Sequence, residues 1–225
     1  MDLTHINEFE KFLKQEVKEA TDELEGLAEG SRKHLQKLVY TNLVDRFDYM
    51  IDKTFISNSM HDNLLDDALK KLDSPVTESV VLKLLMNGDN IHQVVELRVQ
   101  NVLRNGVLRN RHSLKLEKLF QVFGEDSNFK NKRRVNISTG KILAKFTPPN
   151  NKVPTSICGY ADWLYSRRNA VVHGGGNSHI SQIDLDQLKK IYNADVVKTT
   201  RLKLGAITIA SAFYQDVVKL LKSAA

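Results

Sequence analysis

Hydrophobic side chains recur at intervals of three and four residues along most of this chain, which is the spacing of one face of an α-helix. The first such stretch predicts a helix from Thr4 to about Leu24, and the glycine-bounded segment 26–30 ends it. A longer helix is expected from Ser31 onward, with an inner face formed by Leu35, Leu38, Val39, Asn42, Leu43, Phe47, Met50 and Ile51. Shorter amphipathic stretches predict further helices, over residues 60–72, 76–86, 91–103, 113–123, 155–166, 184–192 and 200–221. The expected fold class is all-α, a helical bundle that forms a single domain over residues 1–225.

Two of these helices also carry start signals. Ser74 followed by Pro75 is typical of an N-cap and the first helical position. Asp184 and Gln187 have the spacing of a capping box, which starts the helix that ends near Tyr192.

The segment 124–154 breaks the helical pattern and is expected to be an insertion in the bundle. It contains three of the four prolines and a group of basic residues, Lys130, Lys132, Arg133, Arg134, Lys141, Lys145 and Lys152. Two short apolar runs, 135–137 and 142–144, flank the turn-like residues 138–141 and predict a small β-hairpin. A basic run of this kind is most often a solvated loop.

Composition narrows the class of protein. The apolar fraction of 41% and the charged fraction of 27% are ordinary for a globular chain. No apolar run approaches the roughly 20 residues that a membrane span needs. The first residues lack a basic region followed by an apolar one, so a signal peptide is not expected. The single Cys158 cannot form an intrachain disulfide, so a reducing cytoplasm is expected. A net charge of +6 favours polyanionic partners.

The most informative stretch runs from residue 155 to residue 176. Four polar residues follow one another at spacings of four, three and four and form a file along one helix face: Asp162, Ser166, Asn169 and His173. Arg168 lies instead on the apolar stripe, four residues after Leu164, where a guanidinium needs an anion and several acceptors. The glycines at 174–176 predict that the helix ends just after His173.

The run Arg168-Asn169-x-x-x-His173 resembles the R-x(4–6)-H signature of the HEPN superfamily. The resemblance implies a HEPN-type helical domain that is a metal-independent endoribonuclease, with no cofactor and with RNA as its partner. It also implies a homodimer whose two motifs face one another. A role as a toxin or defence effector, with a neutralising antitoxin or regulatory protein as partner, is compatible with this activity. Arg167 satisfies the looser form of the signature. Gly175 stands where some relatives carry a regulatory Tyr, so that form of regulation is not expected.

The chemistry of RNA cleavage suggests a role for each residue. His173 suits a general base or acid near neutral pH, and Arg168 suits the phosphate because its fork pairs two oxygens. Asn169 is about 40° from His173 around the helix and is expected to orient the ring or hold a phosphate oxygen. Supporting positions are Arg167, Asp162 and Ser166. In this context the basic residues Lys130, Lys132, Arg133, Arg134, Lys141 and Lys145 are expected to add RNA affinity but no chemistry.

Several alternatives stay open. The motif could be structural, a helix C-terminus whose arginine forms a buried ion pair with Asp162 or another acid. The protein would then be a non-catalytic helical module that binds nucleic acid or a protein partner. A metal shared by His173, His179 and Asp184 or Asp186 matches no tight ligand spacing. Cys158 and His173 lie roughly 22 Å apart on one helix, too far for a nucleophilic pair.

Overall fold

The computed structural model describes residues 1–72, 77–88, 90–123, 134–143, 152–173, 179–198 and 202–224. Within these ranges the regular structure is helical, apart from isolated bridge residues, among them an antiparallel bridge between Val135 and Ile142. The predicted all-α class is therefore confirmed.

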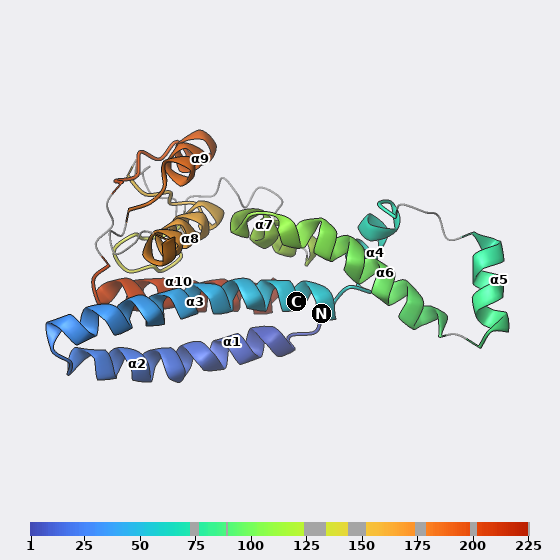
Figure 1. The fold of residues 1–225 in the computed structure, drawn as a ribbon, viewed down its shortest axis with the longest axis horizontal. Coiled ribbons are helices and arrows are strands. Elements are labelled where there is room, and N and C mark those ends of the chain that lie inside the picture. The colour runs from blue at the N-terminus through green and yellow to red at the C-terminus, as the bar shows by residue number, and fades with distance from the viewer. Residues whose placement is uncertain are drawn as a thin grey trace.

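Four helices make the base of the bundle (Figure 1). They are α1 (Thr4–Lys14), α2 (Glu16–Glu25), α3 (Glu29–Ser57) and α10 (Gly205–Ala224). The first two replace the single helix expected over 4–24, because the backbone departs from helical geometry at Gln15. Stacked aromatic rings connect α3 to α10: the ring centroids of Phe47 and Tyr214 are 4.1 Å apart.

A second layer covers one side of α3 and carries the motif (Figure 1). It consists of α7 (His112–Val122) and α8 (Ile157–His173), and α9 (Gln182–Tyr192) packs on α8. Ser181 caps α9, since its side chain accepts a hydrogen bond from the backbone N–H of Asp184. The helix thus begins earlier than the Asp184 start that the sequence predicted.

An arm extends from the bundle beyond α7 (Figure 1). It consists of α4 (Asp62–Leu69), α5 (Glu78–Met86), α6 (Ile91–Asn105) and the short 3-10 helix η1 (Val107–Arg109). None of the residues of α5 is buried, and Met86 is 87% exposed. Ser74 and Pro75, the predicted cap of α5, lie outside the described residues. None of the described helices is long and apolar enough to cross a membrane.

Residues 134–143 of the 124–154 insertion form a tight turn against α10 and the start of α8. The backbone N–H groups of Arg134 and Val135 donate to the carbonyl of Thr155. Gly140 has a φ of +74°, and a Cβ there would lie 1.9 Å from the carbonyl oxygen of Ile209. The predicted hairpin therefore consists of one bridge and a turn that only glycine fits.

Candidate functional site

The motif lies at the C-terminal end of α8. Ser156 caps the start of this helix, because its Oγ accepts from the backbone N–H of Gly159 at 3.1 Å. Gly159 also allows close packing, since a Cβ there would lie 2.9 Å from the ring of Tyr192 on α9. The described helix ends at His173, and the glycines at 174–176 lie outside the described residues.

Arg168 is held by an aspartate from another helix. Its Nε lies 2.7 Å from Oδ1 of Asp45, and its Nη2 donates to Oδ2 of Asp45 at 3.0 Å. Its Nη1 donates to Oδ1 of the adjacent Asn169 at 3.2 Å. The guanidinium also lies 6.0 Å from the ring centroid of Tyr165. With 21% of its side chain exposed, Arg168 is fixed in place but open to solvent on one side.

His173 is exposed on the last turn of α8. His173 lies five positions after Arg168, which corresponds to about 7.5 Å along the helix axis and about 140° around it. An imidazole in this position is accessible to a ligand. The catalytic interpretation requires this access, whereas a purely structural motif could have its histidine buried.

Asp162 and Ser166, the other members of the polar file, are buried. Asp162 accepts hydrogen bonds from the backbone N–H and the Oγ of Ser113, at 3.2 and 2.8 Å, and from the hydroxyl of Tyr192 at 3.0 Å. Because Ser113 is in the first turn of α7, the carboxylate satisfies a free backbone donor and complements the positive end of that helix. Burial and the neighbouring Asp162 carboxylate raise the pKa of Tyr192, so its hydroxyl stays protonated and donates.

Arg167 points into the bundle, unlike Arg168. Its guanidinium lies 4.7 Å from the ring of Trp163 and 5.5 Å from the ring of Tyr40, and the residue is buried. Cation–π contact of this kind stabilises a desolvated charge. Burial raises the pKa of Tyr40 to about 12, although the nearby Arg167 charge opposes the shift. Arg168 is therefore the arginine of the motif that solvent and a phosphate can reach.

A second polar cluster, which the sequence did not reveal, lies beside the motif. His112 stacks on Tyr165 with ring centroids 5.2 Å apart, and its Nδ1 lies 2.9 Å from Oδ1 of Asp48. The buried ammonium of Lys115 bridges Asp48 and Asp52 at 2.6 and 2.7 Å. Burial raises the pKa of Asp48, but the hydrogen bonds and charges of His112 and Lys115 outweigh it and hold that pKa at about 2.

The aspartates that contact Arg168, His112 and Lys115 all come from one face of α3. Asp45, Asp48 and Asp52 recur at spacings of three and four residues, so they share the side that contacts α7 and α8. Their periodicity within an otherwise apolar face was the only signal in the sequence that could have revealed them.

Of the six predicted RNA-binding residues, Lys130, Lys132, Arg133 and Lys145 lie outside the described residues. Arg134 and Lys141 belong to the turn against α10, where Lys141 is exposed and Arg134 is half-buried. Among the described ranges, no group of three His, Cys, Asp or Glu side chains is placed to hold a metal ion.

Comparisons with known proteins add no family assignment: no family model, no curated protein and no solved structure matches the chain. The HEPN resemblance therefore depends on the motif and on its agreement with an all-helical fold.

Proposed function

We propose that this protein is a metal-independent endoribonuclease of the HEPN type, which acts on RNA in the cytoplasm as a homodimer. One observation carries the proposal: an exposed histidine follows a fixed, partly exposed arginine on the last turns of the same helix. A guanidinium has five N–H donors. Arg168 donates one hydrogen bond from each Nη, to Asp45 and to Asn169, and its buried Nε lies in the ion pair with Asp45 without a hydrogen bond. The second N–H of each Nη is left for phosphate oxygens.

The reaction uses the nucleophile that RNA itself contains. His173 takes the proton of the 2′-OH, and the 2′-oxygen attacks the adjacent phosphorus. The bond from phosphorus to the 5′-oxygen breaks, and a general acid returns a proton to that oxygen. The products are a 2′,3′-cyclic phosphate and a 5′-hydroxyl. Arg168 stabilises the charge on the phosphate oxygens during this step.

A homodimer supplies the second proton-transfer group. The attacking and leaving oxygens lie on opposite sides of phosphorus, so one imidazole cannot easily serve both. A two-fold axis beside the C-terminal end of α8 brings His173 of a second copy to the leaving oxygen.

The first test is cleavage of a synthetic RNA in the presence of EDTA, with analysis of the product ends. Wild type is expected to cleave, whereas His173→Ala and Arg168→Ala lose about 10²–10⁴-fold in rate. His34→Ala removes another exposed histidine, on α3, and is expected to retain full activity. Full activity of His173→Ala, or activity that EDTA abolishes and Mg²⁺ restores, would refute the proposal.

The shared site is tested by mixing an Arg168→Ala chain with a His173→Ala chain. Each variant alone is expected to be inactive, whereas exchanged heterodimers, which keep one Arg168 and one His173, regain measurable cleavage below the wild-type rate because the second histidine is missing. A strictly monomeric protein that cuts RNA at full rate would contradict the shared site.

One observation favours the alternative of a non-catalytic module that binds nucleic acid or a protein partner. The ion pair between Arg168 and Asp45 gives the arginine a structural role, as the alternative requires. The same assay decides, because a module that binds RNA without cutting it leaves the RNA intact.

A further inference from the structure

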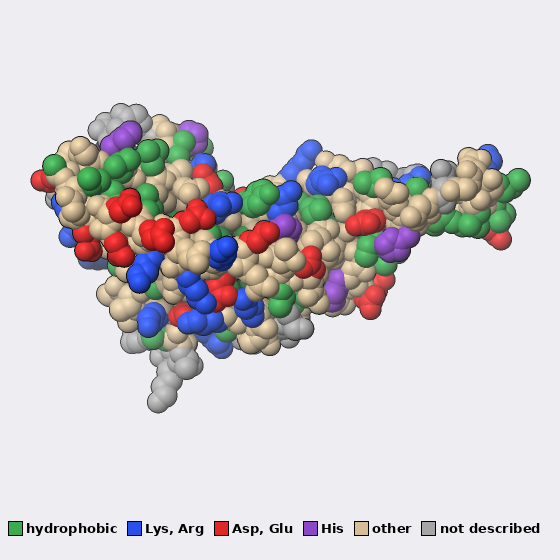
Figure 2. All heavy atoms as spheres, turned by 90° about the horizontal axis from the view of Figure 1, so that it is seen from below, with side chains coloured by type: hydrophobic (Ala, Val, Ile, Leu, Met, Phe, Trp, Pro, Cys, Tyr) green, Lys and Arg blue, Asp and Glu red, His purple; other side chains and the backbone are tan. Residues whose placement is uncertain are grey.

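A long stretch that runs from α6 of the arm into α7 has basic side chains and no acidic ones. Between Glu96 and Glu117 the sequence has no Asp or Glu. The cations of this stretch are Arg98, Arg104, Arg109, Arg111 and Lys115. By contrast, the face of the bundle seen in Figure 2 mixes Lys and Arg with Asp and Glu.

The exposed arginines of this stretch are held by neutral amides. Arg104 donates to Oδ1 of Asn101 at 3.3 Å and to Oε1 of Gln100 at 3.2 Å. Arg109 donates to Oδ1 of Asn105 at 2.9 Å. An amide orients a guanidinium without neutralising it, whereas Arg168 and Lys115 both contact carboxylates. Arg104 and Arg109 therefore present ordered positive charge that their hydrogen bonds to amides do not neutralise.

A groove of about 370 Å³ adjoins these arginines, where the end of α4 meets α6. Its lining includes the basic Lys71 and Arg98, the amides of Asn101 and Asn105, and an apolar floor of Leu72 and Val102. None of the described residues that line it is acidic. Arg98, Asn101 and Asn105 share one face of α6, at spacings of three and four residues. The volume suits a group about the size of a nucleotide.

We propose that this arginine–asparagine surface (Arg98, Asn101, Arg104, Asn105 and Arg109), with its groove, binds single-stranded RNA. The arginines contact phosphates, and the asparagine amides offer a donor and an acceptor to base edges. The apolar floor accommodates a base. This inference deepens the proposed endoribonuclease function, on which it rests, by assigning a second place where the substrate binds.

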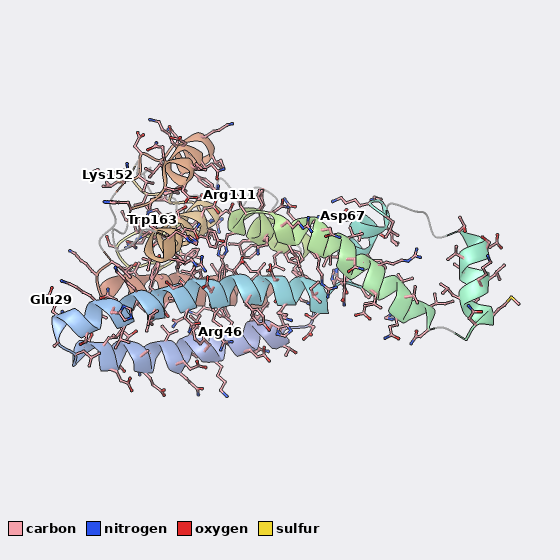
Figure 3. All side chains as sticks on the ribbon, in the orientation of Figure 1. Glu29, Arg46, Asp67, Arg111, Lys152 and Trp163 are labelled. Atoms are coloured by element: carbon pink, nitrogen blue, oxygen red, sulfur yellow. The ribbon has the colours of Figure 1, made fainter. Side chains whose placement is uncertain are left out.

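The surface leads toward the motif. Asn105 and Arg111 are six residues apart, so at most about 20 Å of chain separates them. Arg111 lies where α7 begins beside α8 (Figure 3), and its Nε is 3.6 Å from Oδ2 of Asp162. The next residue, His112, stacks on Tyr165, which lies against Arg168. A single-stranded RNA that binds at the motif can therefore continue along η1 and α6.

The test measures binding of a single-stranded RNA oligonucleotide by fluorescence anisotropy, with His173→Ala in every chain to prevent cleavage. The double variant Arg104→Gln, Arg109→Gln removes two cations of the surface. The matched control Lys11→Gln, Lys18→Gln removes two exposed cations from α1 and α2. Each lost phosphate contact lowers the salt slope by about 0.7, which corresponds to about 5-fold in affinity at 0.1 M salt. The surface variant is expected to bind about 25-fold more weakly, and the control within about 2-fold.

Equal weakening in the control, or no change in the surface variant, would overturn the inference. Competition by polyglutamate as strong as that by RNA would also overturn it, because the surface would then bind any polyanion. Far-UV circular dichroism checks that both variants fold. If wild type cleaves RNA and the surface variant binds RNA normally, the RNA-binding surface is refuted and the proposed endoribonuclease is not. Weakened binding by the surface variant, with no cleavage by wild type, refutes only the proposed endoribonuclease.

Discussion

Replacing Asp48 with Asn should lower the stability of the protein by an amount that depends on pH. The pKa of Asp48 is about 2 in the folded protein, against an ordinary value of 3.8. A folded-state pKa below the unfolded one stabilises the fold above the unfolded pKa, and the stabilisation is lost as pH falls through the folded pKa. A difference of this size corresponds to about 2 kcal/mol at pH 7. Only 28% of the side chain is exposed, so solvent screens the effect little.

Urea unfolding of wild type and Asp48→Asn, followed by far-UV circular dichroism, measures the effect. The difference in the free energy of unfolding should be about 2 kcal/mol at pH 7, change little down to pH 4, and fall to roughly half near pH 3. Asp66→Asn makes the same charge change at an exposed carboxylate on α4 and should alter stability little at any of these pH values. A difference for Asp48→Asn that stays constant from pH 7 to pH 3 would refute the assignment of the stabilisation to an ionised Asp48.

Three further predictions follow from other contacts. In Asp45→Asn, the fold loss in kcat of RNA cleavage should exceed the fold rise in KM by about 10-fold, because Arg168 loses the charge that orients it. An unchanged kcat would contradict this. Gly140→Ala should cost more than about 2 kcal/mol in urea unfolding, since φ is +74° and the methyl meets a backbone carbonyl, whereas Gly30→Ala has open space and should be neutral or stabilising. Asp162→Asn should lower the melting temperature, because it weakens the hydrogen bonds at the start of α7, and leave cleavage per folded molecule unchanged; a loss of kcat in this variant would give Asp162 a role in the reaction.

Sequence periodicity located the helices but was less successful in assigning their buried faces. In α3 the expected inner residues Leu35 and Leu38 are exposed, and Leu38 is 54% exposed. The buried positions on that turn are Gln36 and Tyr40 instead. Gln36 is buried because its side chain donates to the carbonyl of Leu202, a residue 166 positions away. A polar residue on the core side of a helix depends on such a distant partner, which hydrophobic periodicity cannot reveal.

The candidate site shows the same limit. The sequence placed Arg168, Asn169 and His173 on one helix end, because spacing along a single helix fixes their relative positions. It did not reveal Asp45, whose contact with Arg168 spans 123 residues of sequence. Similarly, nothing in the sequence distinguished His112, which lies against Tyr165 because α7 packs on α8. Local order was thus predictable, while partners from other helices required the tertiary fold.

The ion pair with Asp45 also changes the reasoning about a dimer. An arginine on an apolar stripe needs an anion, and the carboxylate that Arg168 contacts comes from α3 of the same chain. The position of Arg168 therefore does not argue for a second copy. What still argues for one is proton transfer: each motif offers one exposed histidine, and an in-line displacement needs a base and an acid on opposite sides of phosphorus. His112 does not offer a second one, because it is buried against Phe47 and Tyr165 with its Nδ1 bound to Asp48. The dimer hypothesis thus depends on the catalytic role of His173, and recovery of activity in the mixed variants tests both together.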